Sequence, residues 1–148
     1  PDGEFLAGIW NEVFELRFAN SGGLDYRHRR RSDHRATPGF VSFSRDSGTC
    51  AFGWAGEFYL LDVSTGTSKP GPRVAADFRD AAFSPTADLF ATAGGDGLMR
   101  LWDPDTWHVA REYDWGCGPL TALAFTADGS AGVCGTADGR LVQFDVDA

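Results

Sequence analysis

Cysteine is scarce in this chain, and so are long hydrophobic stretches. Its 148 residues contain three cysteines, Cys50, Cys117 and Cys134, with no Cys-x-x-Cys pair, which argues against a disulfide framework and against a cysteine zinc site. We expect each cysteine to be a small buried residue in a reducing, cytoplasmic compartment. No apolar run approaches the roughly 20 residues of a membrane-spanning helix.

Basic residues are also few, because 13 Lys and Arg face 21 Asp and Glu, for a net charge of −8. This balance disfavours nucleic acid and anionic membranes as partners. None of the three histidines lies in a nucleophile or metal motif. We therefore expect no catalytic residue, metal site or cofactor. Cys117, between two glycines, is expected to be the most exposed thiol, without a base partner.

Glycines and aromatic residues, in contrast, are abundant. The chain has 19 glycines, and 14% of its residues are aromatic, which favours tight turns between aromatic-rich strands. No apolar face persists at helical spacing for three turns. These features predict an all-β protein.

The sequence repeats itself at a nearly constant interval. Phe43, Phe83 and Phe125 open three similar segments and lie 40 and 42 positions apart. Asp62, Asp103 and Asp145 close those segments with spacings of 41 and 42. A fourth, shorter copy precedes them, in which residues 1–7 match residues 85–91. Such a repeat predicts stacked copies of one supersecondary unit.

Each copy is expected to consist of short strands, which we call a to d from the inner to the outer strand. Asp96-Gly97 and Asp138-Gly139 predict tight b–c turns. The expected a, b and c strands are Phe40–Ser44, Thr49–Gly53, Phe58–Val63, Ala81–Ser84, Leu89–Ala93, Met99–Asp103, Thr121–Thr126, Ala131–Gly135 and Arg140–Val146. The expected d strands are Leu24–Arg29, Arg73–Phe78 and His108–Tyr113.

These segments resemble the WD40 repeat family. The residues that carry the resemblance are Phe83-Ser84-Pro85, Leu89 to Ala93, Asp96-Gly97 and Arg100 to Asp103. The resemblance implies a β-propeller of four-stranded antiparallel blades. His34 stands where the family has the histidine of a Gly-His pair, but Asp33 replaces its glycine. Trp102, Thr92 and Asp96 are expected to form part of the family's buried polar network.

The strand count predicts about three and a half blades in one propeller segment, residues 1–148. Its parts are a partial blade at 1–33, blades at 34–79 and 80–118, and a last blade at 119–148 that lacks its outer strand. Closed propellers have about four to eight blades. The segment is thus expected to be the carboxyl-terminal half of a domain of about seven blades, completed by upstream blades. The alternative is a ring closed by a second copy.

Two groups of residues are candidates for binding a partner. Trp10 and Trp54 occupy matching positions at the end of strand b, so they could present two indoles on one face. Arg29, Arg30 and Arg31 lie in a basic run that could grip an acidic peptide or a phosphate. The alternatives are blade-to-blade packing for the tryptophans and a solvated edge for the arginines. Asp96 and Asp138 are expected to cap their turns.

The resemblance implies a noncatalytic scaffold that presents loops and a face to a protein or peptide partner. The alternative is an accessory propeller within a larger multidomain enzyme or signalling protein, with the chemistry elsewhere. A propeller hydrolase or a lectin-like binder of small ligands would need clustered acids or histidines in the central channel. Fold alone does not decide among these.

Overall fold

The computed structural model describes residues 5–10, 13–18, 24–29, 39–54, 57–72 and 78–146. The described part of the chain contains 14 β-strands, and no helix in it could span a membrane. The strands are β1 (Phe5–Trp10), β2 (Val13–Phe18), β3 (Leu24–Arg29), β4 (Phe40–Phe43), β5 (Thr49–Trp54), β6 (Glu57–Asp62), β7 (Thr67–Pro70), β8 (Phe78–Phe83), β9 (Phe90–Gly94), β10 (Leu98–Trp102), β11 (Val109–Asp114), β12 (Leu120–Phe125), β13 (Ala131–Thr136) and β14 (Leu141–Asp145).

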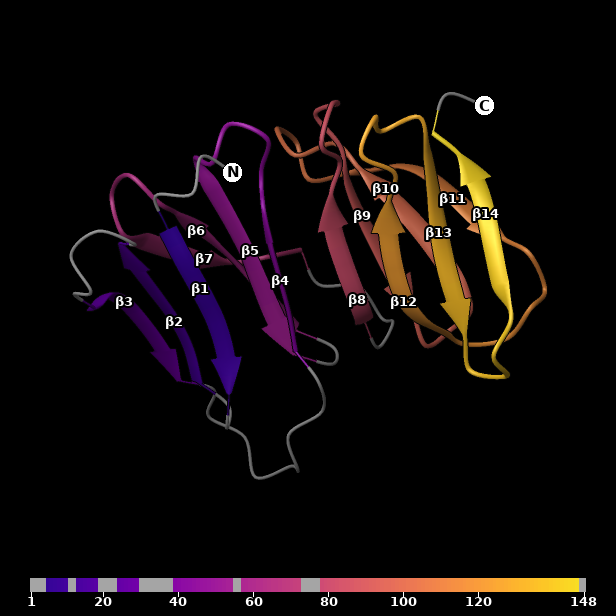
Figure 1. Cartoon of the computed structure of the whole chain (residues 1–148), viewed down its shortest axis with the longest axis horizontal. Helices are drawn as coiled ribbons and strands as arrows, with labels where there is room; N and C mark the ends of the chain where they lie inside the picture. The colour runs from indigo at the N-terminus through magenta and orange to yellow at the C-terminus, as the bar shows by residue number, and fades with distance from the viewer. Residues whose placement is uncertain are drawn as a thin grey trace.

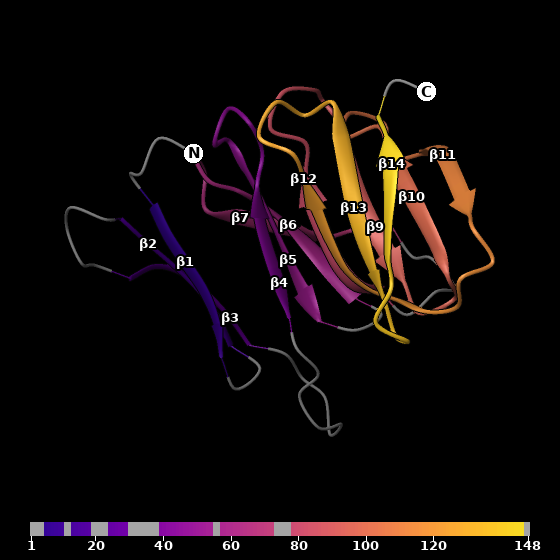
Figure 2. The same cartoon turned by 45° about the vertical axis from the view of Figure 1, so that its right-hand side comes forward.

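The strands form four antiparallel sheets in which each strand pairs with its neighbours in the chain. The sheets are the first blade, β1–β3, the second, β4–β7, the third, β8–β11, and the fourth, β12–β14. Figure 1 shows the first blade at the left, the second beside it, and the third and fourth together at the right. The turned view of Figure 2 keeps the first blade at one end. The predicted all-β class and the predicted succession of strands are confirmed.

One expected strand was wrong. The outer strand of the second blade is β7, Thr67–Pro70, and not Arg73–Phe78. The Gly66 amide donates to the Asp62 carbonyl at 2.9 Å, so the chain reverses directly after β6 and pairs with it. Phe78 instead begins β8, the a strand of the third blade, and residues 73–77 lie outside the described residues.

The b–c turns of the third and fourth blades form where the Asp-Gly pairs predicted them. Gly97 and Gly139 have φ angles of 86° and 85°, a left-handed conformation that favours glycine. Their amides donate to the carbonyls of Gly94 and Thr136 at 3.1 and 3.0 Å. These turns fix the register between strands b and c.

The apolar core lies between blades. One cluster joins the first and second blades, the next joins the second and third, and the last joins the third and fourth. Their buried members are Phe14, Leu16, Cys50, Phe52, Trp54 and Leu61; Phe40, Ala51, Phe58, Leu60, Phe78, Ala81, Phe90 and Trp102; and Ala91, Ala93, Met99, Leu101, Cys117, Leu120, Leu123, Cys134, Phe144 and Val146. Each inner blade therefore buries both faces of its sheet, which holds the blades in sequence order.

Candidate functional site

A groove of about 710 Å³ opens at the seam between the second and third blades, and we call it the seam groove. It lies at the a–b and c–d turns, the end of the blades opposite the b–c turns. The largest apolar side chains of its lining are Leu60 on β6, Phe83 on β8 and Trp107 in the c–d turn of the third blade. Leu60 belongs to the core between these blades, and both aromatic rings pack against that core. The groove is thus the open end of an apolar interface.

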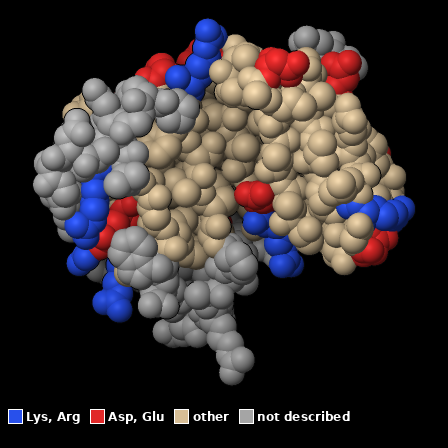
Figure 3. Space-filling view, viewed as in Figure 1, with Lys and Arg blue, Asp and Glu red and all other residues tan. Residues whose placement is uncertain are grey.

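Charged side chains line the seam groove around its apolar part. Four are acidic and two are basic: Asp46, Asp62, Asp88, Asp105, Arg45 and Lys69. In Figure 3 both charge signs appear at the upper margin, the end that carries the a–b turns in Figure 1. Groups of opposite charge around an apolar lining suit a ligand with both polar and apolar parts.

Two of these acids also fix the turns that border the groove. Asp46 accepts hydrogen bonds from Ser44 Oγ and the Gly48 amide at 2.6 and 3.0 Å. Asp62 accepts from Ser64 Oγ and from the backbone amides of Ser64 and Thr65. These hydrogen bonds, led by the serine hydroxyl in each case, lower the pKa of both carboxyls. Both therefore stay ionised at neutral pH, and the groove lining carries two more negative than positive charges.

Trp107 is held in an unusual backbone conformation. Its φ is 57°, in the left-handed region that a bulky side chain rarely adopts. Its amide donates to the Asp103 carbonyl at 2.7 Å, and its ring contacts Phe58 and Phe90 at centroid distances of 6.1 and 5.5 Å. Asp103 Oδ1 further accepts from the amides of Asp105 and Thr106. The indole is therefore fixed from both the turn and the core.

The third blade also contains a buried polar contact between its b and c strands. Trp102 Nε1–H donates to Thr92 Oγ1 at 3.0 Å, and the side chains of both residues are buried. Asp96 does not join this pair, because its carboxylate binds Arg100 Nη2 at 2.7 Å and accepts from the Leu98 amide. Arg100 in turn binds Glu112 on β11.

Residues 71–103 match the family described as WD domain, G-beta repeat. This segment of the chain is similar to a WD40 repeat. The match covers the a, b and c strands of the third blade and ends on Trp102-Asp103, and the four antiparallel sheets are consistent with WD40 blades. A comparison with curated proteins finds no significant match. WD40 repeats generally serve protein interaction and are usually noncatalytic.

At the opposite end of the blades, the structure places only part of the predicted binding face. Trp54 is 1% exposed, and its ring lies 6.2 Å from Phe52 and 6.3 Å from His28 of the first blade. The indole therefore packs between blades, which was the alternative interpretation, and it offers no surface to a partner in this arrangement. Arg29 is exposed at the end of β3. The Trp10 side chain, Arg30, Arg31 and His34 lie outside the described residues.

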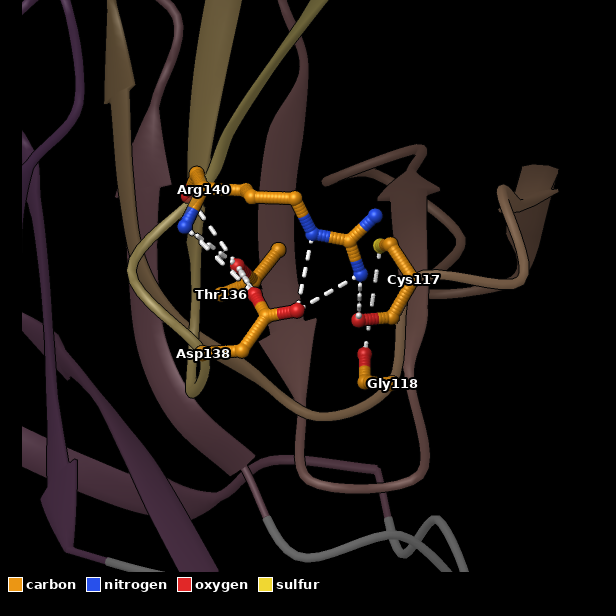
Figure 4. A network of polar contacts seen from close by, with 5 residues as sticks. All are labelled: Cys117, Gly118, Thr136, Asp138 and Arg140. Carbon is orange, nitrogen blue, oxygen red and sulfur yellow. Dashed lines mark hydrogen bonds and ion pairs between the residues drawn. The ribbon is translucent and has the colours of Figure 1, made fainter.

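Asp138 belongs to a polar network at the b–c turn of the fourth blade (Figure 4). Its carboxylate accepts from Arg140 Nε at 2.8 Å and from Thr136 Oγ1, and Arg140 Nη2 also donates to the Cys117 carbonyl at 3.3 Å. The Arg140 hydrogen bond, followed by that of Thr136, lowers the pKa of Asp138 to about 2. The network ties this turn to the segment that enters β12, so Asp138 has a structural role of the kind expected for a turn cap.

The described residues provide little for catalysis. Burial raises the pKa of Cys50 and that of Cys134 to about 12, so both stay protonated. Cys117 is the most exposed of the three thiols, as expected, but at 9% exposed it is still buried: its side chain packs into the core of the third and fourth blades. No three His, Cys, Asp or Glu side chains in the described ranges are grouped as metal ligands would be.

The seam groove was missed by reasoning from the sequence alone. Its lining comes from turns of two blades about 40 residues apart, so their proximity follows only from blade packing. One signal was nevertheless readable. Trp107 follows Asp103 by four positions, as Gly66 follows Asp62, so a tryptophan stands where the preceding repeat has glycine.

Proposed function

We propose that this chain is a noncatalytic protein-interaction scaffold and that a peptide segment of its partner binds in the seam groove. The observation that carries the proposal is the groove itself: about 710 Å³, partly apolar, and bordered by charged turns of the second and third blades, the third of which matches a WD40 repeat. Its volume is in the range of known ligand sites, about 300–1,000 Å³. The three buried thiols, of which Cys50 and Cys134 are held protonated, favour a role without chemistry and a reducing, cytoplasmic compartment.

The rigidity of the turns around the seam groove supports a role in peptide binding. The side chains of Asp46, Asp62 and Asp103 hold the turns around the groove through hydrogen bonds to backbone amides. A preformed site loses little conformational entropy when a partner binds, so more of the contact energy contributes to affinity. A β-sheet framework with fixed turns is therefore well suited to recognition.

A second surface, the outer face of the fourth blade, is a candidate for contact with further blades. The face of the fourth blade that points away from the third carries exposed Ala122, Ala124 and Leu141, the last 76% exposed. Upstream blades of the same protein or a second copy remain the two predicted partners for closing a ring.

The test of the proposal is to fill the groove. Thr67 is an exposed groove residue on β7, and Thr67→Trp places an indole there, since aromatic residues are well accepted in strands. Ala110→Trp on the exposed outer strand β11 is the matched control, because Ala110 does not line the groove. Affinity capture from cell extract with quantitative mass spectrometry would compare both with the parent chain.

We expect a defined set of proteins that the parent and Ala110→Trp capture and that Thr67→Trp does not. Each captured protein would then be purified and titrated against the three chains by calorimetry. Equal capture by all three chains, or none above empty resin, would contradict the proposal.

A further inference from the structure

The strained position of Trp107 points to a role for its indole beyond the turn. The c–d turns of the second and third blades have the same hydrogen bonds: Gly66 and Trp107 each donate to the carbonyl of an aspartate four residues earlier, and their φ angles are 66° and 57°. Glycine adopts this conformation freely, whereas a bulky residue pays a conformational cost. A strained residue that persists at a cavity is a reason to look for function there.

The indole lies where it can meet a ligand. Trp107 is half-buried, lines the seam groove, and is held by the rings of Phe58 and Phe90. A tryptophan face that borders solvent attracts cations through its quadrupole, and more strongly than other aromatic rings do.

Two carboxylates of the groove have no counter-ion of their own. Asp88 and Asp105 are exposed in the groove lining, and no described residue binds either carboxylate. Arg45 is already engaged, because its Nη1 donates to the Thr86 carbonyl at 3.0 Å. The lining as a whole has two more acidic than basic groups, which favours a cationic ligand.

We propose that the seam groove recognises a cationic peptide segment, in which an arginine or lysine next to an apolar residue binds against Trp107. This inference rests on the proposed function and adds the chemistry of the partner. The cation contacts the indole and is balanced by Asp88 and Asp105. The neighbouring apolar side chain covers Leu60 and Phe83, where the interblade core opens into the groove.

The first experiment identifies which peptides the chain binds. A phage-displayed library of random peptides of about 12 residues, long enough to span a site of this volume, would be selected on the immobilised full chain, and the strongest sequence synthesised with a fluorescent label. We expect the enriched peptides to carry Arg or Lys beside an apolar residue. Enrichment of acidic or uncharged peptides, or no enrichment, would overturn the inference.

Variants then locate the binding by fluorescence polarisation. Asp88→Lys reverses one groove charge, and Glu57→Lys is its matched control: an exposed acid on β6, outside the groove, that no described residue binds. Trp107→Gly removes the indole and gives this c–d turn the residue that the second blade has at the same position, Gly66. We expect Trp107→Gly to weaken binding by roughly tenfold, about the value of one desolvated cation–aromatic contact. We expect Asp88→Lys to weaken binding at least as much, because it replaces an attractive charge with a like charge. Glu57→Lys should bind like the parent.

Two controls separate the causes of failure. Circular dichroism would verify the fold of Trp107→Gly. If Trp107→Gly unfolds, Asp88→Lys still tests the inference, because Asp88 is exposed and its replacement disturbs no core contact. Binding should also weaken between about 0.05 and about 0.5 M salt, because the ion pairs are solvent-accessible. If Thr67→Trp abolishes peptide binding but Asp88→Lys and Trp107→Gly do not, the groove binds peptides and the cationic inference is wrong. If Thr67→Trp has no effect, the proposed function itself fails.

Discussion

Replacing Trp102 tests whether the blades are held together by the residues described above. Its side chain is 2% exposed, lies between the second and third blades, and meets the Phe78 ring edge-to-face at 6.4 Å. Trp→Ala at such a site removes the buried indole and leaves a cavity, which typically costs about 3–5 kcal/mol. We expect a loss of unfolding free energy in this range for Trp102→Ala, measured by urea denaturation followed by circular dichroism.

Two further variants separate the contributions to this loss of unfolding free energy. Thr92→Val keeps the shape of the threonine but leaves the Trp102 N–H without its acceptor, which should cost about 1–3 kcal/mol. Val109→Ala removes a 41%-exposed side chain directly across the c–d pair from Trp102 and should cost less than about 0.5 kcal/mol. A Trp102→Ala change as small as that expected for Val109→Ala would refute the packing between these blades.

Two further predictions concern ionisation and thiol access. Because the folded-state pKa of Asp138 is about 2, below its usual 3.8, its carboxylate stabilises the fold at higher pH, and this contribution is lost as pH falls from about 4 towards about 2. The stability advantage of the parent over Asp138→Asn, followed by acid titration in urea, should shrink across that window; a constant difference would contradict the assignment. Cys50, Cys117 and Cys134 should react with iodoacetamide at pH about 8 only after unfolding, because all three are buried. Rapid labelling of the folded chain would show that a thiol is accessible.

Local pattern was sufficient to predict most of the fold. The a, b and c strands and the Asp-Gly turns depend on alternation and turn chemistry within a few residues, and the structure has them within a few positions of the predicted bounds. The d strand of the second blade escaped prediction because Thr67–Pro70 is short, polar and exposed. Its pairing depends on the turn after Asp62 rather than on an apolar pattern.

The candidate site was harder to predict, because it depends on which side chains neighbouring blades cover. From the sequence, Trp54 could either face a partner or pack between blades, and Cys117 was expected to be the most exposed thiol because it lies between two glycines. The first blade covers Trp54, however, and the core between the third and fourth blades encloses Cys117. The seam groove was not predictable for the same reason, since Leu60, Phe83 and Trp107 meet only when two blades pack.

The most direct test of the account is hydrogen–deuterium exchange of the full chain with and without the selected peptide. If a partner segment binds in the seam groove, exchange should slow in β7 and in the c–d turn at 103–107, while the b–c turns at 94–98 and 136–140 are unchanged. Protection confined to those b–c turns would place binding at the opposite end of the blades and contradict the account.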